Sequence, residues 1–193
     1  MNGTNVFARW IKRIARCFAA VCVIAGLIIG LIAAALLAHE VWILLCRCGA
    51  PAFAQQLADA PLPEDARLLS CTAVSGTLGG NGNNFSYLGV LFIEGKGSAE
   101  AYQAHYEKRN YQPPRLATST AAMRVQALTP AQLEDFCRSF DHVPDIYARL
   151  TQTLAPDANW CAIVLHQCHS AYLIDDIVKT ELKELPCTPA YKK

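Results

Sequence analysis

The sequence is poor in charge, and neither sign of charge dominates it. Lys and Arg number 17 and Asp and Glu number 16, so the formal net charge of the 193 residues is +1. Proteins that bind nucleic acid usually carry a basic patch on a folded domain. Here the basic excess lies ahead of a long apolar run instead, at Arg9, Lys12, Arg13 and Arg16. We therefore expect no nucleic-acid partner.

Signatures of the common enzyme classes are also missing. The sequence contains no P-loop, no G-x-G-x-x-G fingerprint, no G-x-S-x-G elbow and no H-E-x-x-H zinc motif. It shows no long internal repeat and no low-complexity tract. An enzyme is therefore not indicated, and we expect no cofactor.

Charge is absent altogether from Cys17 to Ala38, a stretch rich in Ile, Leu, Val and Ala. A helix of about 22 such residues is roughly 33 Å long, which is enough to cross the hydrocarbon core of a bilayer. The apolar character resumes after a short polar interruption. The sequence thus predicts a basic cytoplasmic N-terminus at 1–16 and a transmembrane helix at 17–45, with its core at 17–38.

The flanking charges predict the orientation of this single span. Four basic residues precede it, whereas Arg47 is the one basic residue that follows closely. Because Lys and Arg near the ends of a span are retained in the cytoplasm, we expect a cell-membrane protein with its N-terminus inside and its C-terminal domain outside.

A cleaved signal peptide is the alternative interpretation. Ala52-Phe53-Ala54 before Gln55 has the small-x-small form of a cleavage site, and cleavage after Ala54 would yield a secreted protein. The apolar region exceeds the roughly 7 to 15 residues of a signal-peptide core. Its length therefore favours an uncleaved anchor.

Small residues recur every fourth position along the predicted span. Gly26 and Gly30 form a G-x-x-x-G motif, and Ala34 continues the same stripe. Such a stripe lets two helix backbones approach closely in a membrane. Gly26, Gly30 and Ala34 therefore predict a homodimer through the transmembrane helix.

Prolines follow the span, so we expect a juxtamembrane linker at 46–66 without regular structure between Gly49 and Asp65. An extracytoplasmic domain at 67–193 comes next. Its apolar, β-rich runs at 68–77 and 85–94 flank a loop of Gly and Asn, which predicts an antiparallel hairpin.

The remainder of the domain alternates between helical and strand patterns. Ser98 and Thr129 suit N-caps, and Gln132 completes a capping box with Thr129. The predicted class is α+β, with a small, mainly antiparallel sheet and helices packed on one face. The further predicted elements are helices at 98–109, from Thr129, after Pro144 and from Ser170 to Leu185, and strands at 122–128 and 160–167.

Reactive side chains are densest near the last predicted strand. His166, Cys168 and His169 follow Cys161, and imidazole and thiolate are common zinc ligands. In a strand His166 and Cys168 would point to one face and Cys161 to the other. The spacing matches no known zinc motif, so we expect no metal site. Five of the nine cysteines lie in the domain, so they cannot all pair with one another.

Together these patterns predict a membrane-anchored, non-enzymatic binding or accessory domain. Its partner would be an extracytoplasmic protein or a small ligand that the sequence does not identify. The alternative is a hydrolase-like cell-surface enzyme that uses a Cys/His or metal site between Cys161 and His169.

Overall fold

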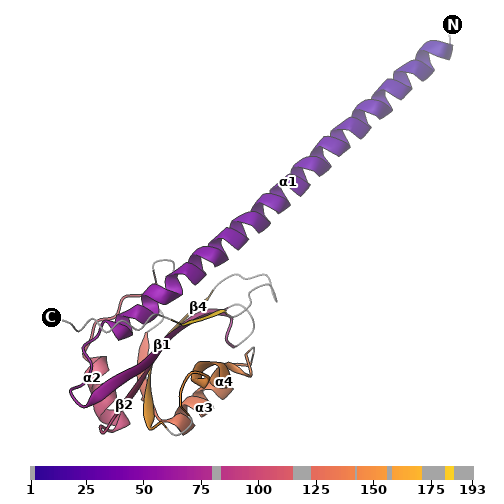
Figure 1. Ribbon diagram of the computed structural model, residues 1–193. Helices are drawn as coiled ribbons and strands as arrows, with labels where there is room; N and C mark the ends of the chain where they lie inside the picture. Colours follow the sequence, from indigo (N-terminus) through magenta and orange to yellow (C-terminus); the bar gives the residue numbers. More distant parts are fainter. Residues whose placement is uncertain are drawn as a thin grey trace. The chain divides into compact units, whose positions relative to one another are not determined.

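The computed structural model describes residues 3–79, 84–114, 123–141, 143–155, 158–170 and 181–184. The chain divides into two units, 1–43 and 44–193, and each is described by itself. Figure 1 shows a long N-terminal helix, α1, and a sheet with shorter helices around it.

Helix α1 runs from Gly3 to Ala58. The expectation of irregular structure after Gly49 is therefore wrong as far as Ala58, although Pro51 lies inside the helix. Proline within a helix costs about 3 kcal/mol. Phe53 and Leu57 are buried in the 44–193 unit, and burying two such side chains contributes roughly 3 to 6 kcal/mol. The free energy gained by burying Phe53 and Leu57 thus exceeds the cost of placing Pro51 inside the helix.

Within the described residues, five strands form one sheet in the order β3-β4-β2-β1-β5, and all four pairings are antiparallel. The predicted hairpin is confirmed, since β1 and β2 pair from Ala66 with Gly95 to Gly76 with Ser86. The α+β class is confirmed as well. The strands are β1 Ala66–Gly76, β2 Asn84–Gly95, β3 Arg124–Leu128, β4 Trp160–Ser170 and β5 Glu181–Glu184.

Three shorter helices in the described part of the chain follow the predicted pattern. They are α2 Ala99–Glu107, α3 Pro130–Arg138 and α4 Ile146–Thr151. Ser98 caps α2 by accepting a hydrogen bond from the backbone N–H of Ala101. Thr129 and Gln132 form the capping box at the start of α3, which satisfies backbone donors that a helix N-terminus leaves unpaired.

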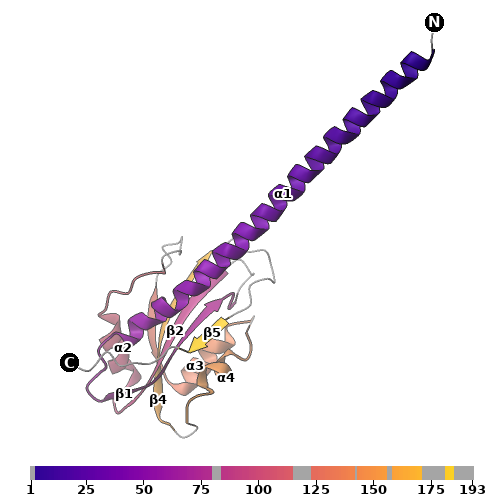
Figure 2. The same ribbon diagram turned by 45° about the horizontal axis from the view of Figure 1, so that its top comes forward.

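The prediction that the helices pack on one face of the sheet is wrong, because both faces are covered. On one face Leu88, Val90 and Phe92 of β2 form a cluster with side chains of α3 and α4. On the other face Gly89 lies against Ala54 near the end of α1. Helix α2 lies on that second face too, where Gln103 accepts a hydrogen bond from the N–H of Ala127. Figure 2 shows α3 and α4 together, apart from α2.

The reason for two-sided burial is visible in β2. Every residue from Phe85 to Ile93 is buried. A strand that alternates apolar and polar residues exposes one face, whereas an unbroken apolar strand requires cover on both.

The predicted last helix is also wrong where the structure describes its span. Glu181–Glu184 forms β5, which pairs with Thr72 to Ser75 of β1. Pairing with β5 satisfies backbone N–H and C=O groups along this part of β1. The helical pattern gave no sign of this pairing. Residues 171–180 of that prediction lie outside the described residues.

We predict that Gly89→Ala destabilises the 44–193 unit by about 1 to 3 kcal/mol, the usual cost of overpacking a core. A Cβ at this position would lie 2.9 Å from the Ala54 Cα atom and 3.1 Å from its Cβ atom. The free energy of unfolding of the full chain in detergent, measured by circular dichroism in urea, checks the prediction.

Gly49→Ala is the matched control, because its added Cβ would make ordinary contacts of 3.8 and 3.9 Å with Pro114 and Tyr87. It should leave the unfolding midpoint unchanged or raise it, since alanine favours helix over glycine. Equal midpoints for Gly89→Ala and the unmodified chain would contradict the close packing of α1 on β2.

Candidate functional site

The structure separates the reactive residues near the end of the chain. His166 lies on the face covered by α3, where its ring centroid is 5.9 Å from that of Phe136 and 6.0 Å from that of Phe140. Cys161 lies on the opposite face, beside Tyr102 of α2 in a separate surface hollow. Five positions along a strand also separate two residues by about 16 Å. Cys161 and His166 are therefore not a nucleophile and its base.

The buried thiols in the folded unit are poorly suited to nucleophilic chemistry. Burial raises the pKa of Cys161 to about 11, with an opposing hydrogen bond to the Leu128 backbone. Burial also raises the pKa of Cys137 to about 12. Both thiols are protonated at neutral pH, and the thiolate is the reactive form. None of the eight cysteines in the described part of the chain forms a disulfide.

The candidate metal ligands are not assembled either. Among the described residues, no three His, Cys, Asp or Glu side chains lie close enough to hold a metal ion. Cys168 is half-buried on β4, and the side chain of His169 lies outside the described part. A structural zinc site normally needs four ligands.

His166 is a core residue with one unsatisfied nitrogen. Its Nε2 atom is buried and has no hydrogen-bond partner among the described residues. Burial lowers the pKa of this imidazole, and the positive charge of Arg124 lowers it further. The ring is therefore held neutral in the folded protein, packed edge-on against two aromatic rings.

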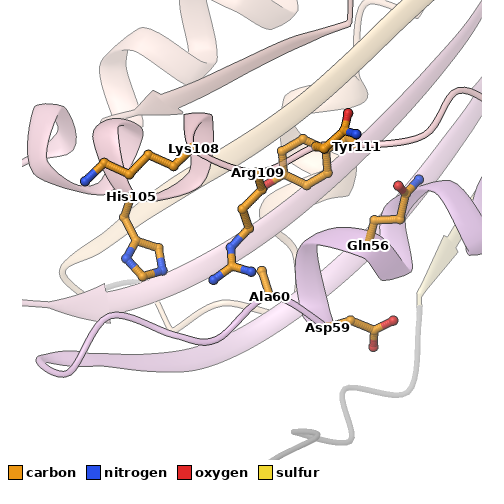
Figure 3. A pocket seen from close by; sticks show the side chains of 8 residues that line it. Gln56, Asp59, Ala60, His105, Lys108, Arg109 and Tyr111 are labelled. Atoms are coloured by element: carbon orange, nitrogen blue, oxygen red, sulfur yellow. The ribbon is translucent and has the colours of Figure 1, made fainter.

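A polar hollow with a volume of about 610 Å³ is a candidate for binding in the described part of the 44–193 unit (Figure 3). One wall comes from the end of α1 and the residues directly after it. The other comes from the last turn of α2 and the segment that follows. Its lining residues are Gln56, Asp59, Ala60, His105, Lys108, Arg109, Asn110 and Tyr111.

Two side chains hold the walls of this polar hollow together. The Gln56 Nε2 atom donates to the carbonyl oxygen of Gln112 at 3.0 Å, and the Gln112 N–H donates to Gln56 Oε1 at 2.7 Å. This pair of bonds ties the segment after α2 to α1. The Tyr111 hydroxyl donates to the carbonyl oxygen of Tyr106 at 3.2 Å, which folds the segment back onto α2. Hydrogen bonds within the chain therefore fix both walls of the hollow.

The charges around the polar hollow are not paired with one another. Within the described residues neither Lys108 nor Arg109 forms a salt bridge. Asp59 instead accepts a hydrogen bond from the Gln55 side chain at 2.9 Å. Figure 3 shows the Asp59 carboxylate turned away from the Arg109 guanidinium.

Arg109 has an unsatisfied donor. Its Nε atom is buried and has no hydrogen-bond partner among the described residues. Leaving a buried donor unpaired costs about 1 to 3 kcal/mol, and more when the group is charged. The guanidinium also lies near Tyr111: burial raises the pKa of that phenol to about 12, and the charge of Arg109 opposes the rise.

His105 supplies a fixed imidazole beside this guanidinium. Its Nε2 atom lies 2.8 Å from the carbonyl oxygen of Pro61. A carbonyl oxygen only accepts hydrogen bonds, so Nε2 carries the proton and donates. This contact also ties the segment after α1 to α2.

Sequence reasoning missed the polar hollow. The adjacent cations Lys108 and Arg109 are visible after a predicted helix, but Lys and Arg are common at helix C-termini, where they offset the helix dipole. Nothing in the sequence places Gln56 and Asp59 beside them, because about 50 residues separate the two walls.

The predicted association residues lie in the N-terminal unit, on α1. Added Cβ atoms at Gly26 and Gly30 would meet nothing within 4 Å. Ala34 lies one helical turn further along and is exposed.

Comparison with known proteins gave no match to a family model, to a curated protein or to a solved structure.

We predict that His166 makes the folded unit less stable as the pH falls below about 6.5. Its folded-state pKa is lower than the ordinary value of 6.5, so the unfolded chain binds the proton more readily. The stability that the neutral ring contributes is complete above pH 6.5 and is lost as the pH falls toward the folded-state pKa. The free energy of unfolding measured between about pH 5 and pH 7.5 checks this prediction.

Two variants assign the effect. His166→Leu should flatten the slope of stability against pH over that range. Arg124→Gln removes the nearby positive charge, which should raise the pKa of His166. It should therefore reduce the slope of the free energy of unfolding against pH, and it leaves the packing of the His166 ring in place. An unchanged slope in both variants would rule out His166 as its source.

Proposed function

We propose that this protein is anchored in a membrane by α1 and presents its α+β unit as a binding or accessory module. The observation that carries the proposal is the bare apolar surface of α1. Between Trp10 and Leu37 its large apolar side chains are 45 to 71% exposed. The helix is long and apolar enough to cross a membrane by length and composition.

Exposed to water, such a surface is costly. Burying one large aliphatic or aromatic side chain contributes about 1.5 to 3 kcal/mol, so covering more than a dozen of them is worth tens of kcal/mol. A lipid bilayer provides that cover without any requirement for shape complementarity. The absence of charge from Cys17 to Ala38 fits the hydrocarbon core.

The proposed orientation places the N-terminus in the cytoplasm and residues 44–193 outside. Its support is the basic cluster before the span, which outnumbers the basic residues that closely follow it. A binding role for the exterior unit is supported by the polar hollow, whose walls are tied by hydrogen bonds within the chain.

The test is protease treatment of intact cells, combined with alkaline carbonate extraction of their membranes. We expect the full-length chain to remain in the membrane pellet, and protease added outside to remove residues 55–193. Release of the intact chain by carbonate would contradict the anchor, and protection of 55–193 would contradict the orientation. A mature N-terminus at Gln55 would show that the segment is a cleaved signal peptide.

The small-residue stripe supports a second part of the proposal, a homodimer through α1. No side chain of the described unit occupies the space at Gly26 and Gly30, so a second helix could approach there. We predict that replacing both glycines by Ile weakens association of the full chain in a bilayer, because β-branched side chains hold the backbones apart. Resonance energy transfer between labelled chains measures this association.

Leu27→Ile is the control, because it introduces the same side chain beside the stripe. It should leave energy transfer unchanged. Equal transfer in the control and in the double glycine variant would exclude this face as the dimer contact.

A further inference from the structure

Resting on the proposed binding role of the exterior unit, we propose that the polar hollow binds a small molecule through a carboxylate or phosphate group held by Arg109. The hollow has a volume of about 610 Å³, within the range of about 300 to 1,000 Å³ that is typical of small-ligand sites.

The unsatisfied donor of Arg109 points to an acceptor on the ligand. Its buried Nε–H has no partner among the described residues, and its guanidinium forms no salt bridge with them. A guanidinium presents a planar fork of donors that matches the two oxygens of a carboxylate or phosphate. A ligand of this kind would accept hydrogen bonds from the guanidinium and neutralise its charge.

The charge of the hollow contrasts with that of the domain. Gln55 to Lys193 carries 12 Lys and Arg against 15 Asp and Glu, so the domain is mildly acidic. The lining reverses the balance, with Lys108 and Arg109 against Asp59. Asp59 is engaged by the Gln55 amide and turned away from Arg109, so it does not fill the place of the ligand (Figure 3).

The neighbours of Arg109 give the site a fixed shape. Figure 3 shows the His105 ring and the Arg109 guanidinium pointing in the same direction, with the ring of Tyr111 on the side of Arg109 away from His105. His105 is held by Pro61 and Tyr111 by Tyr106. Lys108 extends away from the guanidinium, so it acts through its charge at the rim. Residues held in advance lower the entropy cost of binding.

The experiment is a titration of the ¹⁵N-labelled full chain in a zwitterionic detergent, followed by NMR. Inorganic phosphate and succinate are added separately, with sodium chloride at equal ionic strength as the reference. We expect saturable shifts of the Arg109 Nε–H and the Asn110 backbone N–H with at least one of the two anions. Saturation by phosphate alone or by succinate alone assigns the group that the site prefers.

Three variants are read through the Asn110 backbone N–H. Arg109→Gln should weaken binding at least about tenfold, because it removes the charged fork. Lys108→Gln should weaken it about two- to fivefold, and added salt should reduce that difference. Arg138→Gln is the matched control, since Arg138 pairs with Glu134 and Asp135 on α3, and it should leave the affinity unchanged.

Shifts that stay linear, or that match those with chloride, would overturn the proposal. So would saturable binding of equal affinity in Arg109→Gln and Arg138→Gln. If Arg109 serves only to offset the dipole of α2, Arg109→Gln lowers the unfolding midpoint while the unmodified chain shows no saturable shift. Carbonate extraction of the same chain tests membrane anchoring separately from ligand binding. If carbonate releases the chain from membranes but the chain still binds an anion saturably, the membrane anchor is contradicted and the ligand site is not.

Discussion

The close contact between Ala54 and Gly89 is the constraint on which the folded unit depends. Because Gly89 has no side chain, the end of α1 lies directly against β2, and Phe53 and Leu57 are buried beside it. This contact covers the second face of a sheet whose central strand is apolar on both sides. It also explains why the helix continues past Pro51, since the packed side chains contribute more than the proline costs.

The same packing creates the polar hollow. Once α1 lies on the sheet, Gln56 and Asp59 are brought to the end of α2, and the two hydrogen bonds between Gln56 and Gln112 fix the facing segment. Arg109 is half-buried between these walls, and no carboxylate among the described residues pairs with it. The helix that carries the long apolar segment therefore also provides one wall of the proposed ligand site.

The residues with the most reactive side chains near the last predicted strand, His166 and Cys161, are packing residues in the folded unit. His166 is held neutral between Phe136 and Phe140, and burial keeps the Cys161 thiol protonated. They lie on opposite faces of β4, so closeness in sequence did not bring them together. Lys108 and Arg109, which resemble an ordinary helix end in sequence, line the hollow because of what packs beside them.

Local patterns in the sequence determined most of the secondary structure. The apolar run of α1, the β1–β2 hairpin, the Ser98 cap and the Thr129 capping box each depend on neighbouring residues, so they could be predicted. The α+β class followed from their order. Only the tertiary structure decided which elements cover each face, the helix beyond Pro51, the pairing of β5 with β1, and the placement of Gln56 and Arg109 around one hollow. These features depend on contacts between segments far apart in the chain, whose burial energies outweigh local preferences and leave no periodic signal in the sequence.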